Sequence, residues 1–244
     1  MTHGSRLPWA SGPGEILRHG LSLLKNDSDT NRRLAMISID NAVELMIKTY
    51  LGLPKRITGL AIARKQYTEI SESFPALLDG LEQYAPDKLD GIDLGTIEWY
   101  HRLRNELYHQ GNGLTVERDK IEIYAELANR LFKNLFGEEL IPHATPETEL
   151  LGEFISAWVA LESGLRAWAS RQSLLGSDHA SILHNMRFLK DAGLLDKTQV
   201  AELNHIRQVR NEIIHGQVDF KSVLTQDLID RVKQYANIFD ADAV

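Results

Sequence analysis

Two nearly identical hexapeptides constrain the fold of this chain more than any other feature of its sequence. Residues 104–109 read Arg-Asn-Glu-Leu-Tyr-His, and residues 210–215 read Arg-Asn-Glu-Ile-Ile-His. Because an average residue type makes up about 5% of a protein, two such matches in one chain are not expected by chance. We therefore expect the chain to contain the same structural unit twice.

The residues around the two hexapeptides agree with a tandem duplication. Apolar residues before each hexapeptide recur in the same register, and so do four residues far upstream. The pairs are Ile97, Tyr100, Leu103 and Leu107 with Leu203, Ile206, Val209 and Ile213, and Ser38, Ala42, Glu44 and Lys48 with Ser156, Ala160, Glu162 and Arg166. The predicted units are residues 1–140 and 145–244, and the linker between them contains Pro142.

Helical periodicity dominates both units, and the sequence shows no alternating strand pattern of useful length. Apolar residues spaced three and four apart predict long helices over 30–51, 116–136 and 145–174. Shorter helices are expected over 15–25, 95–109, 179–192, 197–215 and 221–239, with two more within 61–84 and a loop over 52–59. The predicted fold class is all-α: two tandem four- or five-helix bundles packed as an intramolecular pseudo-dimer.

Composition excludes several classes of protein. The chain is 43% hydrophobic, which is enough to bury a core, and it lacks cysteine, so disulfides, thiolate zinc sites and iron–sulfur clusters are excluded. Its net charge of −7 argues against coating long nucleic acids. No apolar run reaches the roughly 18 residues of a membrane span, and no signal peptide is visible. We expect a soluble cytoplasmic protein without a metal or cofactor and without a membrane partner.

The hexapeptides carry side chains suited to phosphodiester chemistry. On a helix, residues four apart lie about 40° apart around the axis, so the motif asparagine and histidine share a face. Histidine exchanges protons near pH 7, and arginine stabilises a phosphate whose negative charge grows in a transition state. The candidate catalytic residues are Arg104, Asn105, His109, Arg210, Asn211 and His215.

Two facing motifs would supply a base, an acid and two guanidinium groups. RNA brings its own nucleophile, the 2′-hydroxyl, so no covalent protein residue is needed. The predicted reaction is metal-independent cleavage of RNA that leaves a 2′,3′-cyclic phosphate and a 5′-hydroxyl. DNA lacks the nucleophile and should resist.

Several charged residues have competing interpretations. Glu44 and Glu162 each precede a basic residue by four positions, so each forms a structural ion pair or orients a motif arginine. Glu106 and Glu212 are expected to be exposed, with a supporting role at the site as the alternative. Lys55 and Arg56 are candidates for binding RNA phosphates, although scattered basic residues are more often simply solvated. His101 and His205 occupy different positions in the two copies and are interpreted as ordinary residues without a role at the site.

The Arg-Asn-x-x-x-His pattern near a helix C-terminus resembles the signature of the HEPN superfamily (higher eukaryotes and prokaryotes nucleotide-binding). The resemblance covers residues 14–138 and 146–240. It implies metal-independent ribonuclease activity where two bundles pair, in a toxin or antiviral-defence effector that acts on RNA and is controlled by an antitoxin or regulatory protein. It leaves open a monomeric pseudo-dimer or a homodimer. The alternative is a non-catalytic module that binds nucleotide or RNA, or scaffolds a partner.

Overall fold

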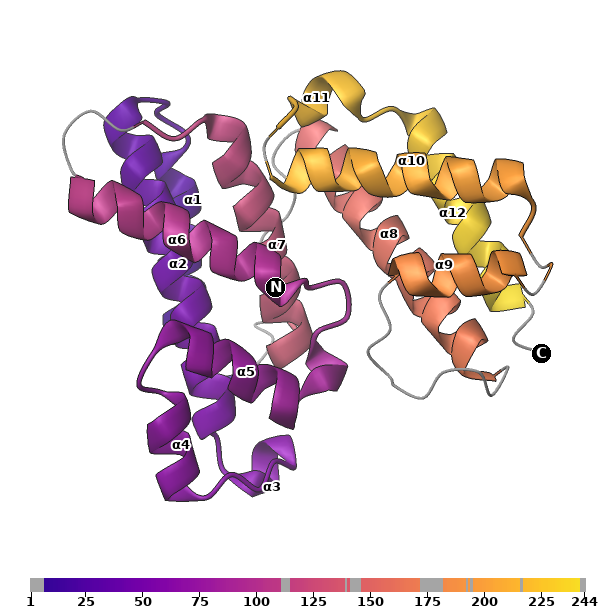
Figure 1. Cartoon of the computed structure of the whole chain (residues 1–244). Helices are drawn as coiled ribbons and strands as arrows, with labels where there is room; N and C mark the ends of the chain where they lie inside the picture. The colour runs from indigo at the N-terminus through magenta and orange to yellow at the C-terminus, as the bar shows by residue number, and fades with distance from the viewer. Residues whose placement is uncertain are drawn as a thin grey trace, which may run out of the picture. The chain divides into compact units, whose positions relative to one another are not determined.

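The computed structural model describes residues 7–110, 115–138, 140, 146–171, 182–191, 193, 195–215 and 217–241. Every long element in this part of the chain is a helix and none is a strand, which confirms the all-α class (Figure 1). The chain divides into two compact units, Met1–Pro142 and His143–Val244, called unit 1 and unit 2 below. No helix in the described ranges is both long enough and apolar enough to cross a membrane.

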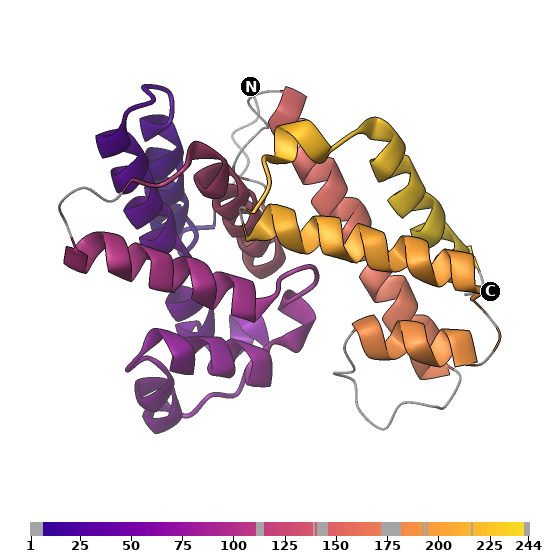
Figure 2. The same cartoon turned by 45° about the horizontal axis from the view of Figure 1, so that its top comes forward.

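Unit 1 is built around one long helix, α2. This helix packs mainly against α1, α5, α6 and α7, and α6 crosses it at a steep angle (Figures 1 and 2). The Ser28 hydroxyl caps α2 by accepting a hydrogen bond from the Asn31 amide at 3.2 Å. The elements are α1 (Ser11–Leu23), α2 (Asp29–Gly52), α3 (Lys55–Thr58), α4 (Arg64–Ile70), α5 (Phe74–Tyr84), a 3₁₀ turn (Pro86–Lys88), α6 (Leu94–Gln110) and α7 (Arg118–Phe136).

The described part of unit 2 contains fewer helices than unit 1, and its central helix, α8 (Pro146–Arg171), is of similar length to α2. The others are α9 (Ile182–Asp191), α10 (Lys197–Ile214), α11 (Phe220–Val223) and α12 (Gln226–Ala241). Helix α8 contacts α9 and α12, and α10 crosses in front of it in both views (Figures 1 and 2). Asp196 begins α10 with a capping box in which its carboxylate accepts from the amides of Thr198 and Gln199.

Each unit packs its long helix closely against a neighbour at a glycine. A Cβ on Gly20 of α1 would lie 3.0 Å from the Ile39 side chain of α2. A Cβ on Gly164 of α8 would lie 3.1 Å from Phe239 of α12. Small residues at these positions let the helix backbones approach each other, which brings the central helices into contact with their partners.

Three expected boundaries differ from the structure. The helix predicted over 15–25 begins four residues earlier, at Ser11. The predicted loop over 52–59 contains a one-turn helix, α3, which starts after Pro54 and ends at Gly59 with φ of 80°. The predicted helix over 221–239 is two helices, because two side chains provide separate caps. Asp219 accepts from the Lys221 amide at 2.9 Å to begin α11, and Thr225 accepts from the Leu228 amide at 3.2 Å at the start of α12.

Candidate functional site

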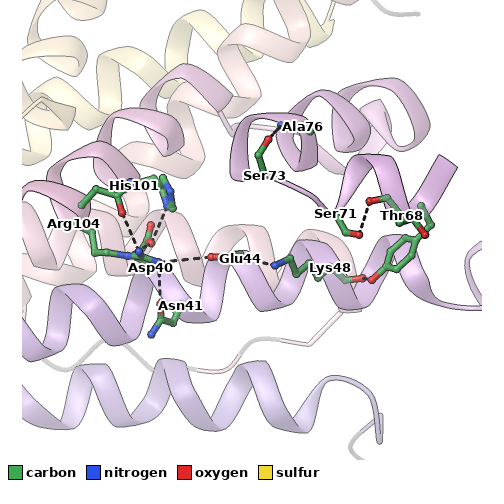
Figure 3. A network of polar contacts seen from close by, with 12 residues as sticks. Asp40, Asn41, Glu44, Lys48, Thr68, Ser71, Ser73, Ala76, His101 and Arg104 are labelled. Atoms are coloured by element: carbon green, nitrogen blue, oxygen red, sulfur yellow. Dashed lines mark hydrogen bonds and ion pairs between the residues drawn. The ribbon is translucent and has the colours of Figure 1, made fainter. Parts of the chain in front are cut away.

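The first motif arginine, Arg104, is held by three side chains of unit 1. Its Nε donates to Asp40 Oδ2 at 2.7 Å, and its Nη1 donates to Asn105 Oδ1 at 2.9 Å. Its Nη2 donates to Asn41 Oδ1 at 3.0 Å (Figure 3). The Arg104 side chain is 17% exposed, so it is mostly covered while part of it faces solvent. The guanidinium is therefore fixed in direction at the junction of α2 and α6.

Asp40 is the buried centre of this arrangement. Its side chain is fully buried, and it accepts from groups on two other helices. Besides Arg104, His101 Nδ1 donates to Oδ2 at 2.9 Å, and the Tyr124 hydroxyl donates to Oδ1 at 2.8 Å. A buried carboxylate is tolerated only when it is paired and hydrogen-bonded, and here an arginine and two further donors meet that need.

Aromatic packing fixes two of the donors to Asp40. The His101 ring stacks on Phe74 with centroids 3.9 Å apart, and the Tyr124 ring stacks on Tyr100 at 4.4 Å. Burial of the Tyr124 hydroxyl, together with the neighbouring Asp40 carboxylate, raises its pKa well above the ordinary value. Tyr124 therefore stays protonated and keeps donating to Asp40 throughout the neutral range.

Glu44 contacts both a lysine on its own helix and the motif arginine. Its Oε1 accepts a hydrogen bond from Lys48 Nζ at 2.6 Å, which is the expected ion pair along α2. Its Oε2 lies 3.6 Å from Nη2 of Arg104, so it also adds negative charge beside the motif arginine. Asp40, Glu44 and Lys48 follow one another at single-turn spacing on the side of α2 that faces α6 (Figure 3).

The second motif arginine, Arg210, has a different environment. Its side chain is buried, at 8% exposed, and Nη1 donates to Asn211 Oδ1 at 3.2 Å. Its Cζ lies 5.9 Å from the ring centroid of Trp158, which is the range of a cation–π contact. The contact between motif arginine and motif asparagine thus occurs in both units, but the group beneath the arginine differs.

The register of the two copies shows what replaces the Asp40 network in unit 2. In the register that pairs Ser38 with Ser156, Asp40 corresponds to Trp158. Aligning the hexapeptides pairs His101 with Arg207. Tyr124 corresponds to Val232, because that register matches buried Ile121, Ala128 and Leu131 of α7 with buried Ile229, Ala236 and Phe239 of α12. Unit 2 therefore has an indole and a valine where unit 1 has a carboxylate and a phenol.

The other predicted site residues lie in different surroundings. The His109 side chain lies outside the described residues, and His215 is half-buried at the C-terminal end of α10. Lys55 and Arg56 are exposed on α3, beyond the end of α2. The helix from Asp40 to Gly52 alone spans about 18 Å at 1.5 Å per residue, so the structure does not bring these two cations to Arg104.

The predicted acidic residues of the motif helices are peripheral. Glu106 is exposed, as expected, whereas Glu212 is half-buried and accepts from Gln208 Nε2 at 2.9 Å. Glu162 is half-buried on α8. In the ranges that the structure describes, no three His, Asp or Glu side chains converge as a metal-ligand cluster.

Sequence reasoning missed four residues that contact Arg104 or Asp40. Asp40 itself carried a usable signal, because an aspartate between Ile39 and Val43 falls within the apolar positions of α2 and predicts a buried partner. His101 was interpreted as an ordinary residue, whereas it is mostly buried and contacts Asp40. Asn41 and Tyr124 gave no comparable signal, because their contacts depend on how α2, α6 and α7 meet.

Comparisons of the chain with protein-family models, with curated proteins and with solved structures find no match.

Proposed function

We propose that this protein is a metal-independent endoribonuclease whose two Arg-Asn-x-x-x-His motifs act on one phosphodiester. The observation that carries this proposal is the contact common to both units, in which the motif arginine donates to the motif asparagine at 2.9 Å and 3.2 Å. An arginine that is already fixed does not lose further freedom when it binds a phosphate. Such pre-organised charge is a large contribution to transition-state stabilisation.

Arg104 has donors left for a substrate. A guanidinium carries five N–H groups, and the described contacts with Asp40, Asn41 and Asn105 engage three of them. Within those three hydrogen bonds, each Nη atom retains one N–H, Nη2 also forms an ion pair with Glu44 Oε2 at 3.6 Å, and the side chain remains 17% exposed. Two N–H groups from one rigid fork match two oxygens of a phosphate.

In the proposed reaction the RNA supplies the nucleophile. One motif histidine removes the 2′-hydroxyl proton, the 2′-oxygen attacks phosphorus, and the bond from phosphorus to the 5′-oxygen breaks. The other histidine gives its proton to the departing 5′-oxygen, while Arg104 and Arg210 stabilise the added negative charge. The products are a 2′,3′-cyclic phosphate and a 5′-hydroxyl. The biological setting we propose is a toxin or antiviral-defence effector under the control of a partner protein.

The test is cleavage of a mixed RNA pool in EDTA at pH 7. His109→Ala, His215→Ala and Arg104→Ala should each lower the rate by at least about 100-fold, the usual loss for a group that transfers a proton or stabilises charge. Two substitutions on the same helices serve as matched controls: exposed His205→Ala on α10, and Arg102→Ala on α6, whose side chain is 71% exposed. Equal rates for the wild type and the three site variants would refute the proposal.

A second candidate function is a non-catalytic module that binds RNA or nucleotide or scaffolds a partner. This function is favoured because both motif arginines make contacts that stabilise the fold. Arg104 forms a hydrogen bond with buried Asp40, and buried Arg210 lies over Trp158. Saturable RNA binding without cleavage by the wild type, even with a cell extract added as a source of activators, would favour this function.

A further inference from the structure

A small pocket adjoins the Arg104 site on unit 1. It has a volume of about 190 Å³ and is lined by Thr30, Arg33, Leu34 and Ile37 of α2 and by Leu107 of α6. Leu34 is one of three large apolar side chains that are clearly exposed in the described part of the chain, at 47%, the others being Ile57 and Ile238. Leu34 therefore gives the pocket a wall that is both apolar and accessible to solvent.

The pocket continues the surface that holds the motif arginine. Ile37 lies four residues before Asn41 on α2, and Leu107 lies three residues after Arg104 on α6. Residues at these spacings are neighbours on one helix face, about one 5.4 Å turn apart. The lining is therefore about one turn from the Asn41–Arg104 hydrogen bond, in the direction of the N-terminus of α2.

We propose that this pocket binds the base of a ribonucleotide whose phosphate lies on Arg104; the inference rests on the proposed function. The base and the phosphate are attached to the same ribose, so their binding sites must lie next to each other. The apolar walls formed by Leu34, Ile37 and Leu107 cover the faces of a base, and the Arg33 guanidinium provides both a planar group and positive charge beside the sugar–phosphate chain. At about 190 Å³ the pocket is smaller than the roughly 300–1,000 Å³ of drug-sized ligand sites, so it fits one ring system rather than a protein helix.

The described residues of α8 in unit 2 do not reproduce the α2 side of this pocket. In the register of α2 and α8, Arg33, Leu34 and Ile37 correspond to Leu151, Gly152 and Ile155, and all three of these unit 2 residues are buried. The apolar opening and the cation are thus replaced by covered core residues. The structure assigns base binding to the half that also carries the Asp40–Arg104 pair.

The test is methyl NMR of the full chain with labelled isoleucine and leucine, titrated with each ribonucleoside 3′-monophosphate. We expect saturable shifts of the Leu34, Ile37 and Leu107 methyl signals, with those of Ile57 and Ile238 unmoved. Ribose 5-phosphate and inorganic phosphate, which lack the base, should leave the pocket signals in place. Equal pocket shifts with these base-free probes, or no pocket shifts with any nucleotide, would overturn the inference.

Substitutions test the same point through affinity. Leu34→Asp should weaken nucleotide binding by about tenfold or more, the size expected when one base loses its stacking surface. Ile57→Asp and Ile238→Asp place the same charge at exposed apolar positions elsewhere and should have no effect. Leu34→Ala should weaken binding to a lesser degree, and it keeps the test valid if circular dichroism shows that Leu34→Asp unfolds.

These experiments distinguish a failure of base binding from a failure of the proposed ribonuclease activity. Pocket shifts in a chain that never cleaves RNA would support base binding and refute the ribonuclease. Cleavage that depends on Arg104 but proceeds unchanged in Leu34→Asp, with no nucleotide shifts at the pocket, would support the ribonuclease and refute base binding.

Discussion

Units 1 and 2 hold the same arginine in two different ways. In unit 1, Arg104 is bound by the buried carboxylate of Asp40, which also accepts from His101 and Tyr124. In unit 2, Arg210 lies over the indole of Trp158. The comparison shows that the short motif specifies the arginine and its asparagine, while the central helix beneath decides whether that arginine is directed by a charge or covered by an aromatic face.

The two solutions differ in how strictly they orient the guanidinium. Hydrogen bonds to a carboxylate and two amides define the plane and direction of Arg104. A cation–π contact at 5.9 Å holds Arg210 against a ring, in addition to its hydrogen bond to Asn211, but does not itself define the direction of each N–H. The units are therefore not interchangeable, and substitutions beneath each arginine should act differently.

The largest effect is expected for Trp158→Ala. Removing a buried indole leaves a cavity, which costs about 3–5 kcal/mol of unfolding free energy, and Arg210 loses its aromatic surface as well. Hydrogen–deuterium exchange of the full chain should show faster exchange in peptides from α8 and α10. Peptides from α2 and α6 are the internal control, and equal acceleration there would mean that the two units unfold as one.

Asp40→Asn should have the next largest effect, about 1.5–3 kcal/mol, because the hydrogen bonds to charged Arg104 lose their anionic partner. The amide still fills the space, so packing is kept. Exchange in α2 and α6 peptides measures the loss. The matched control is Asp27→Asn, which changes a carboxylate in an accessible ion pair with Arg32. If both variants behave alike, the buried carboxylate has no special role.

Tyr124→Phe should cost about 1 kcal/mol at neutral pH, because one hydrogen bond to Asp40 is lost while two other donors remain. It should also change the alkaline pH dependence. The pKa of Tyr124 is raised in the folded state, so above about pH 10 the unfolded chain ionises first and stability falls by up to about 1.4 kcal/mol per pH unit.

The measurement is urea unfolding of the wild type and Tyr124→Phe between pH 8 and 11. The variant should lose less stability than the wild type above pH 10, because one tyrosine with a raised pKa has been removed. Buried Tyr100, whose pKa burial also raises, stays in both proteins, so some alkaline loss should persist. Parallel curves for the two proteins would contradict the assignment.

The smallest effect is expected for Arg102→Ala. This arginine lies on α6 two residues before Arg104, but it is 71% exposed and its partner is Glu98 one turn earlier. Such exposed pairs contribute about 0.3–0.5 kcal/mol. Urea unfolding should therefore hardly separate the variant from the wild type. A loss approaching that of Asp40→Asn would remove the contrast between the covered arginine and the exposed one.

The sequence predicted the helices well because their caps and apolar spacing are local. Ser28, Asp196 and the left-handed Gly137 define helix ends that short-range rules identify. The break between α11 and α12 was missed because the caps from Asp219 and Thr225 compete with a pattern that also suits a continuous helix.

The site was predictable only in part. Motif repetition selected Arg104 and Arg210, and the spacing of Glu44 and Lys48 predicted their ion pair. The contacts of Asp40 with His101 and Tyr124 join residues 61 and 84 positions apart, and no local pattern encodes them. The motif itself also does not predict that Arg104 contacts the Asp40 carboxylate whereas Arg210 contacts the Trp158 indole.

The sequence separation between Asp40 and its partners also determines when these contacts can form during translation. The carboxylate emerges from the ribosome with α2, whereas Arg104 follows 64 residues later and Tyr124 follows 84 residues later. Until His101 and Arg104 have been made, only water can solvate Asp40, so a nascent α1–α2 hairpin cannot bury this position without leaving a charge unpaired. Unit 1 therefore reaches its native core only when α7 has been made, and a chain truncated before Tyr124 should remain a substrate for chaperones and proteases.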